Sequence, residues 1–103
     1  MNKNKVIEAL ENGNIEWRKH ALERMLERGI SRNEVKEVLK KGDIIEYYDN
    51  DTPFASALFF YVNRKPIHVV ASLDEVNKII YVITAYIPDI IHFKKDLKTR
   101  RKK

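Results

Sequence analysis

Residues 78–89, KIIYVITAYIPD, decide the fold because they form the longest run of β-favouring residues in the chain. Apolar or aromatic side chains occupy every position from Ile79 to Ile83, and the run ends at Pro88. A strand whose odd-numbered and even-numbered positions are both apolar is typically buried on both faces. We therefore expect this stretch to be the most interior strand of a sheet, with a site at its polar last third.

Shorter runs upstream predict the other strands. They are residues 43–48, 54–62 and 67–73. Turn-rich links separate them, which favours a meander of antiparallel neighbours. Pro88 stands where a final helix would begin and run through Phe93 and Leu97 into the C-terminus.

Apolar periodicity before the sheet predicts three helices. They cover residues 5–12, 20–28 and 31–41. Trp17 falls in a brief linker, and the second helix has an apolar stripe made of Leu22, Met25 and Leu26. The order of elements predicts an α+β domain spanning residues 1–103. Its N-terminal helices pack on one face of a four-stranded antiparallel sheet, and a short C-terminal helix follows.

The link between the second and third helices carries specific end signals. Gly29 followed by Ile30 predicts a Schellman stop, in which Ile30 folds back on Met25. Ser31 and Glu34 match a capping box, which opens the third helix. We therefore expect a tight helical hairpin over residues 20–41.

Composition excludes several classes of function. The chain has no cysteine, and its three histidines are too far apart in sequence to form a ligand pair. Its three glycines all lie at predicted helix ends, so no glycine-rich nucleotide loop is possible. We expect no metal and no cofactor.

The sequence contains no signal peptide and no membrane-spanning run, which makes the cytoplasm the expected location.

The positive charge is concentrated at the C-terminus. Residues 94–103, KKDLKTRRKK, carry seven positive charges and one negative, so the rest of the chain, from a net charge of +5, sums to −1. The tail is either a phosphate-binding arm or a solvated end that aids solubility. The first interpretation assigns RNA contacts to Lys94, Lys95, Lys98, Arg100 and Arg101.

Two groups of polar residues are candidates for chemistry. His20, Arg24 and Arg28 are spaced for one helical stripe, which is either a solvated face paired with glutamates or a phosphate-binding face. His68 is the polar residue of an apolar strand. It faces Thr84, with Tyr86 two residues along, if five residues separate paired Leu73 and Ile79; a shorter loop moves the group to opposite faces. The alternative for His68 is a structural histidine with satisfied ring nitrogens.

A third pair, Asp89 and His92, lies at the start of the predicted final helix. Asp89 is expected to be a helix cap or first-turn acid. We interpret Asp89 as structural and His92 as a surface residue.

Three blocks of the sequence resemble a family of small prokaryotic domains of unknown function. They read HALERMLERGIS at residues 20–31, HVV at 68–70 and TAYIPD at 84–89. The resemblance covers roughly residues 17–100, and Gly42 and Arg100 also fit it. At Phe93 the chain departs from the tryptophan expected in the family, but it keeps an aromatic anchor.

That family looks like a branch of the RelE/ParE/BrnT toxin superfamily, and its members are often encoded beside a YgiT-type zinc-finger antitoxin. The resemblance implies a RelE-like fold and a toxin that cuts RNA, including messenger RNA on the ribosome, and is held by a cognate antitoxin. The resemblance also favours a functional role for His20 and Arg24, because both belong to the motif.

Two functional hypotheses follow. The first is a metal-independent endoribonuclease in which His20 or His68 is the acid or base, Arg24 and Arg28 neutralise the phosphate, and Tyr86 stacks on a base or donates a proton. The second is a non-catalytic module of the same fold that binds RNA or protein. A third possibility is an immunity or structural protein whose tail is merely solubilising.

Overall fold

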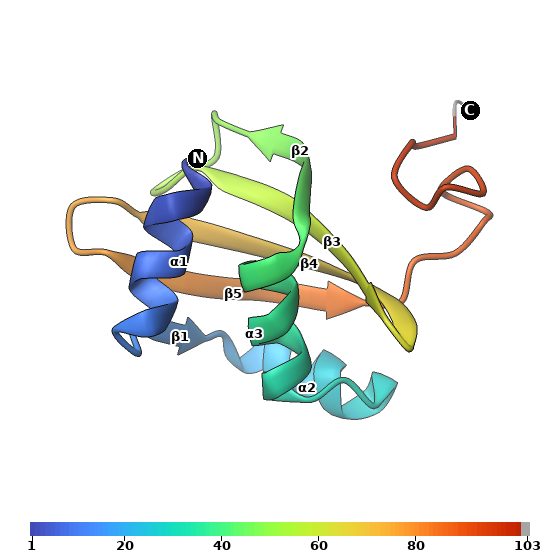
Figure 1. The fold of residues 1–103 in the computed structure, drawn as a ribbon, viewed down its shortest axis with the longest axis horizontal. Helices are drawn as coiled ribbons and strands as arrows, with labels where there is room; N and C mark the ends of the chain where they lie inside the picture. The colour runs from blue at the N-terminus through green and yellow to red at the C-terminus, as the bar shows by residue number, and fades with distance from the viewer. Residues whose placement is uncertain (102–103) are drawn as a thin grey trace.

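The computed structural model describes residues 1–101, which form three helices and a five-stranded sheet (Figure 1). The elements in chain order are α1 (Lys3–Glu11), β1 (Ile15–Trp17), α2 (Lys19–Arg28), α3 (Arg32–Lys41), β2 (Asp43–Tyr48), β3 (Ser56–Asn63), β4 (Lys65–Asp74) and β5 (Ile79–Tyr86). The strands lie side by side in the order β1-β5-β4-β3-β2. Lys102 and Lys103, the end of the predicted basic tail, lie outside the described residues.

The predicted α+β class is confirmed, but the prediction of four antiparallel strands is wrong. β2 to β5 form the expected antiparallel meander, and β1 adds a fifth strand parallel to β5. Ile15 pairs with Ile80 and Trp17 with Val82. A strand of three residues is too short for an alternation of apolar and polar residues to be recognised. Trp17 was therefore predicted to lie in a linker.

The prediction that residues 78–89 form the most interior strand is also wrong. β4 occupies the centre of the sheet, and β5 lies between β4 and the short β1. Along β5 only Ile80, Val82 and Ala85 are buried, whereas its other side chains are partly exposed. The second face of β5 is rich in aromatic and β-branched residues, so the sequence looked apolar on both parities although only one face is covered.

The three helices cover one face of the sheet and leave the other face without helices (Figure 1). α2 contacts β5, while α3 contacts β3 and β4. The core between the layers includes Val6, Met25, Val35, Leu39, Phe59, Val69, Ile80 and Val82. None of the helices formed by residues 1–101 is long and apolar enough to cross a membrane.

The predicted helix-end signals between α2 and α3 are confirmed. Gly29 adopts a left-handed conformation, and the Ile30 N–H donates to the Met25 carbonyl oxygen at 2.9 Å. Ser31 and Glu34 form both hydrogen bonds of a capping box. The prediction that Leu26 belongs to the buried apolar stripe of α2 is wrong, because Leu26 is 85% exposed. The covered face is centred on Ala21 and Met25, and Leu26 lies one residue, about 100°, away from it.

The predicted C-terminal helix does not form. Residues 87–101, here called the C-terminal segment, make one turn and then reverse direction. Asp89 accepts hydrogen bonds from the following backbone N–H groups as a helix cap would. Leu97 then takes a positive φ, and Phe93 forms a bridge with Arg100. The reversal places Phe93 against the sheet with 2% exposure, which a continuing helix would not do.

Gly42 is predicted to be the least replaceable glycine, because its Cα approaches two backbone groups. An added Cβ would lie 2.5 Å from the Val38 carbonyl oxygen and 2.6 Å from that of Phe60. We expect Gly42→Ala to lower the free energy of unfolding by about 3 kcal/mol in urea titrations. Gly29→Ala is the control: its Cβ meets open space at a φ of +65°, and it should cost only about 1 kcal/mol. Equal losses in the two variants would contradict this account.

Candidate functional site

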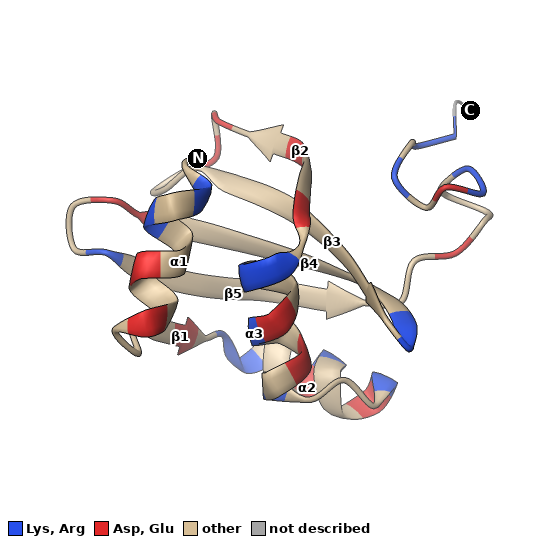
Figure 2. Cartoon of the chain, viewed as in Figure 1, with Lys and Arg blue, Asp and Glu red and all other residues tan. Residues whose placement is uncertain are grey.

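The candidate site lies on the sheet face that the helices leave uncovered, at the end where β5 finishes. The C-terminal segment folds over this end, so residues from the middle and the end of the chain meet there (Figure 1). The segment carries several of the lysines and arginines of the chain (Figure 2). His68 on β4 lies beneath it.

His68 is fully buried and has a partner for each ring nitrogen. Nε2 lies 2.7 Å from the Leu97 carbonyl oxygen, and Nδ1 lies 3.2 Å from the Tyr86 hydroxyl. A carbonyl oxygen only accepts, so Nε2 carries the proton. In the neutral ring Nδ1 is then an acceptor, to which the Tyr86 hydroxyl donates. The ring edges of Phe60 and Phe93 close the remaining space.

Burial keeps this pair uncharged. Desolvation lowers the pKa of His68 below its ordinary value, and the hydrogen bond that His68 donates to the Leu97 carbonyl oxygen and the charge of Glu46 oppose the shift only in part. Desolvation also raises the pKa of the Tyr86 phenol. The neutral pair can pass one proton: if the phenol oxygen accepts a proton from a ligand, its own proton moves to Nδ1 of His68.

A β-bulge brings His68 and Tyr86 together. Asp74 pairs with Ile79, so the loop between β4 and β5 is one residue shorter than the register that would place His68 opposite Thr84. That shorter loop alone would move the group to opposite faces. The register shifts again between Val70 and Ala71, and His68 therefore pairs with Tyr86.

Tyr86 opens into a cavity of about 430 Å³, here called the tyrosine cavity. Its lining comes from α2, the end of β5 and the C-terminal segment. The residues are Arg28, Tyr86, Ile87, Asp89, His92, Phe93 and Arg100. Two cations, a phenol and an imidazole therefore converge on one space, a combination suited to a phosphate group and to proton transfer.

The two arginines of the tyrosine cavity are held differently. Arg100 Nε lies 2.8 Å from a Glu46 carboxylate oxygen, so much of its charge is compensated. Arg28 donates from Nη1 to the Ala85 carbonyl oxygen at 2.9 Å. Among residues 1–101 no carboxylate lies within ion-pair distance of Arg28. It is therefore the better phosphate ligand of the two.

The predictions for Asp89 and His92 are confirmed, since Asp89 caps a turn and the His92 side chain is 71% exposed, and both residues also line the tyrosine cavity. The His92 Nδ1 lies 3.0 Å from an Asp89 carboxylate oxygen, and hydrogen bonds led by that from the His92 backbone hold the pKa of Asp89 below its usual value. A carboxylate that holds Nδ1–H leaves Nε2 available for proton transfer. Both residues precede Phe93 and line the cavity beside Tyr86, a position that their spacing in the sequence did not indicate.

The structure separates the predicted helical stripe. Arg28 lines the tyrosine cavity, whereas His20 is exposed and lines a different cavity near the start of α2. Arg24 is exposed and pairs with Glu27 at 3.2 Å. Proximity therefore does not link His20 or Arg24 with His68, and the catalytic roles assigned to them stay predictions.

The basic tail is partly tied to the protein. Lys98 lies 3.8 Å from an Asp43 carboxylate oxygen, and Arg101 donates to the carbonyl oxygen of Phe93. Lys94 and Lys95 are exposed, and none of the ion pairs found within residues 1–101 involves them. Within the same residues no three His, Cys, Asp or Glu side chains come close enough to hold a metal ion.

Comparison with known proteins places the chain in one family. The family described as a domain of unknown function (DUF4258) matches residues 17–87, so the chain belongs to it. The match includes Arg28, His68 and Tyr86 and ends before Asp89 and His92. No curated protein and no solved structure matches the chain.

The buried His68 predicts a pH dependence of stability. Its folded pKa lies below the ordinary value of 6.5, so the unfolded state binds more protons between the two values. Acidification through this window must therefore favour unfolding, by at most about 1.4 kcal/mol per pH unit for one proton. Urea titrations at pH 7 and pH 5 should show the loss.

His68→Phe should abolish most of this loss, whatever its effect at pH 7, because it removes the titrating ring. His92→Gln, which removes an exposed imidazole, is the control and should keep the loss. The charges that face His68 are those of Glu46 and Arg100. A His68→Phe variant with the pH slope of the unmodified protein would contradict the assignment.

Proposed function

We propose that this protein is a metal-independent endoribonuclease whose active site is the tyrosine cavity. The observation that carries the proposal is the convergence of Arg28, Tyr86, His92 and Arg100 on one cavity of about 430 Å³. Cleavage that uses the 2′-hydroxyl of RNA as nucleophile needs a base, an acid and a cation near the phosphate. The cavity contains candidates for all three.

In this proposal the Tyr86–His68 pair is the base. The 2′-oxygen attacks phosphorus as its proton passes to the Tyr86 oxygen and the phenol proton passes to Nδ1 of His68. His92, protonated and held by Asp89, donates its Nε2 proton to the departing 5′-oxygen as the phosphorus–oxygen bond breaks. The products are a 2′,3′-cyclic phosphate and a 5′-hydroxyl.

Arg28 and Arg100 would bind the non-bridging phosphate oxygens, whose charge grows as the new bond forms. His68 is then a positioning and proton-accepting residue behind Tyr86, since full burial keeps it from touching the substrate. The roles of Lys94, Lys95 and Lys98 are limited to contacts with the RNA backbone further along the strand.

We also infer that the chain is a RelE-like toxin held by an antitoxin. Support comes from the motif blocks at residues 20–31 and 84–89, and from an exposed apolar rim beside the cavity. Ile87 lines the cavity, and Ile90 and Ile91 are 60% and 77% exposed. A partner that covered this rim would close the cavity and silence the enzyme.

The test is a digest of a long mixed-sequence RNA with and without EDTA, followed by analysis of the fragment ends. We expect EDTA-resistant cutting to cyclic-phosphate ends. Tyr86→Phe and His92→Gln should each lower the rate by about 10²–10⁴-fold, the usual contribution of an acid or base. Arg28→Gln should also lower the rate, because it removes a phosphate ligand. The matched control for Tyr86→Phe is Tyr47→Phe, at an exposed tyrosine of β2, and the matched control for Arg28→Gln is Arg32→Gln. Both controls should be fully active. Loss in His20→Ala and Arg24→Ala without loss in Tyr86→Phe would contradict the assignment.

One observation favours a second candidate, an RNA-binding module without catalysis. Both ring nitrogens of His68 are already occupied within the protein, as in a structural histidine. This alternative predicts retention of RNA without products. Log affinity should then fall with log salt at about 0.7 per phosphate contact, and Arg28→Gln should reduce that slope by about one contact.

A further inference from the structure

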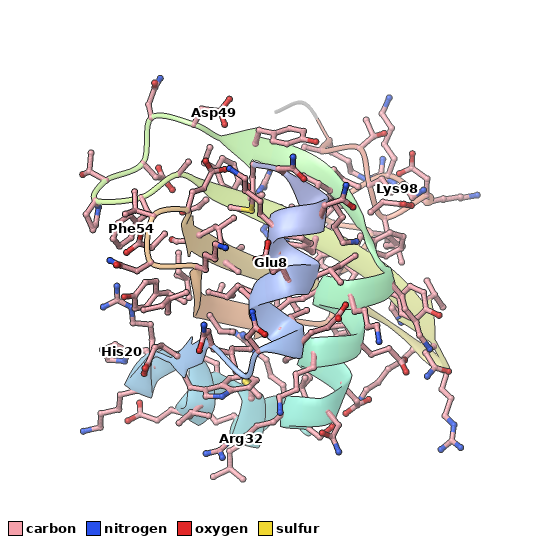
Figure 3. The ribbon with its side chains drawn as sticks, turned by 60° about the vertical axis from the view of Figure 1, so that its left-hand side comes forward. Glu8, His20, Arg32, Asp49, Phe54 and Lys98 are labelled. Atoms are coloured by element: carbon pink, nitrogen blue, oxygen red, sulfur yellow. The ribbon has the colours of Figure 1, made fainter. Side chains whose placement is uncertain are left out.

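A second cavity, of about 350 Å³, lies on the same open sheet face at the opposite end from the tyrosine cavity. It is here called the serine cavity, because Ser56 of β3 and Ser72 of β4 line it. The β1–α2 junction supplies Arg18, and the β2–β3 loop supplies Asp51 and Phe54. Figure 3 shows His20 and Phe54 along one edge of the molecule, with Lys98 on the opposite side. Neither the proposed reaction nor the tail uses this cavity.

The wall of the serine cavity is a rigid aromatic platform with a cation. Phe54 stacks on Tyr81 with ring centroids 5.6 Å apart and planes within 5°. The Arg18 guanidinium lies 5.4 Å from the Tyr81 ring centroid. The backbone of Arg18 is held in place because its N–H donates to the Val82 carbonyl oxygen and extends the pairing of β1 with β5. Within residues 1–101 no carboxylate lies within ion-pair distance of Arg18, so its charge is free to bind an anion.

The serine cavity also contains an unused hydrogen-bond donor. The Ser56 and Ser72 hydroxyls lie 2.9 Å apart and are 1% and 8% exposed as residues. Two hydroxyls have two hydrogens, and their mutual bond uses one. The other hydrogen has no acceptor among residues 1–101. A ligand in the cavity with a suitably placed acceptor can therefore receive a hydrogen bond from the serine pair.

We propose that the serine cavity binds a nucleobase of single-stranded RNA. The base stacks on the exposed side of Phe54, the free serine hydrogen donates to a ring nitrogen or carbonyl oxygen, and Arg18 binds the adjoining phosphate. Asp51 accepts a hydrogen bond from an exocyclic amine. Adenine, guanine and cytosine have such an amine and uracil has none, so the cavity disfavours uracil.

This inference takes RNA as the ligand from the proposed function and adds a subsite to it. The two cavities are connected along β4: Ser72 follows His68 by four residues, about 13 Å at the rise of a strand. Half-buried Val70 and Thr84 pair across β4 and β5 between them. One extended RNA strand can therefore place a base in the serine cavity and a phosphate in the tyrosine cavity.

The test measures binding of mononucleotides, which requires no cutting. AMP and UMP are titrated into the full chain, and backbone amide shifts are followed by NMR. We expect AMP to shift residues of the serine cavity and to bind more tightly than UMP. Phe54→Leu keeps an apolar side chain but removes the stacking surface, and it should weaken AMP binding by about 5-fold or more.

Two matched pairs isolate the polar contacts. Arg18→Gln should weaken both nucleotides, whereas Lys19→Gln, the same charge change one residue away and outside the cavity, should not. Asp51→Ala should narrow the difference between AMP and UMP, whereas Asp49→Ala, in the same loop but outside the cavity, should keep it.

Shifts confined to the tyrosine cavity, or no shift with either nucleotide at millimolar concentration, would overturn the proposal. The proposal would also be overturned if the Phe54→Leu and Arg18→Gln variants bound AMP as tightly as the unmodified protein does. The RNA digest is a separate measurement. RNA cutting without nucleotide binding at the serine cavity would contradict only the proposed subsite. Nucleotide binding at the serine cavity without RNA cutting would contradict only the proposed reaction.

Discussion

The burial of His68 is the constraint on which the candidate site depends. An imidazole without solvent contact must satisfy both nitrogens internally, and here the partners are the Leu97 carbonyl oxygen and the Tyr86 hydroxyl. The first bond ties the C-terminal segment to the centre of the sheet. The second fixes the tyrosine at the end of β5. Once the segment is held in this way, Phe93 seals the histidine from water, and His92 and Arg100 reach the cavity.

Compensation of charge decides which cations remain for a ligand. Seven positive charges in residues 94–103 suggested a diffuse phosphate-binding arm. In the fold, Glu46 pairs with Arg100 and Asp43 lies near Lys98, so carboxylates of the protein compensate part of that charge. Arg28, from a helix of mixed charge, is left with a backbone carbonyl as its partner. A local excess of charge in the sequence therefore does not show how much of that charge is compensated within the fold.

Local signals in the sequence predicted local structure, and long-range pairing escaped them. The capping box at Ser31 and the left-handed stop at Gly29 depend on neighbouring residues, and both were predictable. The parallel pairing of Ile15–Trp17 with β5 joins residues 65 positions apart and left no pattern in three residues. The contact of His68 with Tyr86 needed a loop length and a β-bulge together, and periodicity specifies neither. Asp89 was predicted as a cap and does cap a turn, but no local signal indicated that it would line a cavity.

If one RNA strand binds in both cavities, as proposed, the charges of the cavities decide on which side its backbone lies. Each cavity has an arginine that pairs with no carboxylate of residues 1–101, Arg28 or Arg18, and each also contains an aspartate, Asp89 or Asp51. A phosphate beside either aspartate would be repelled, so the backbone of the strand must follow the arginines. Both arginines come from the helical side of β5, since Arg18 precedes α2 and Arg28 ends it. The phosphates would then run along the β5 edge of the open face, and the bases would turn inward over β4 and β3.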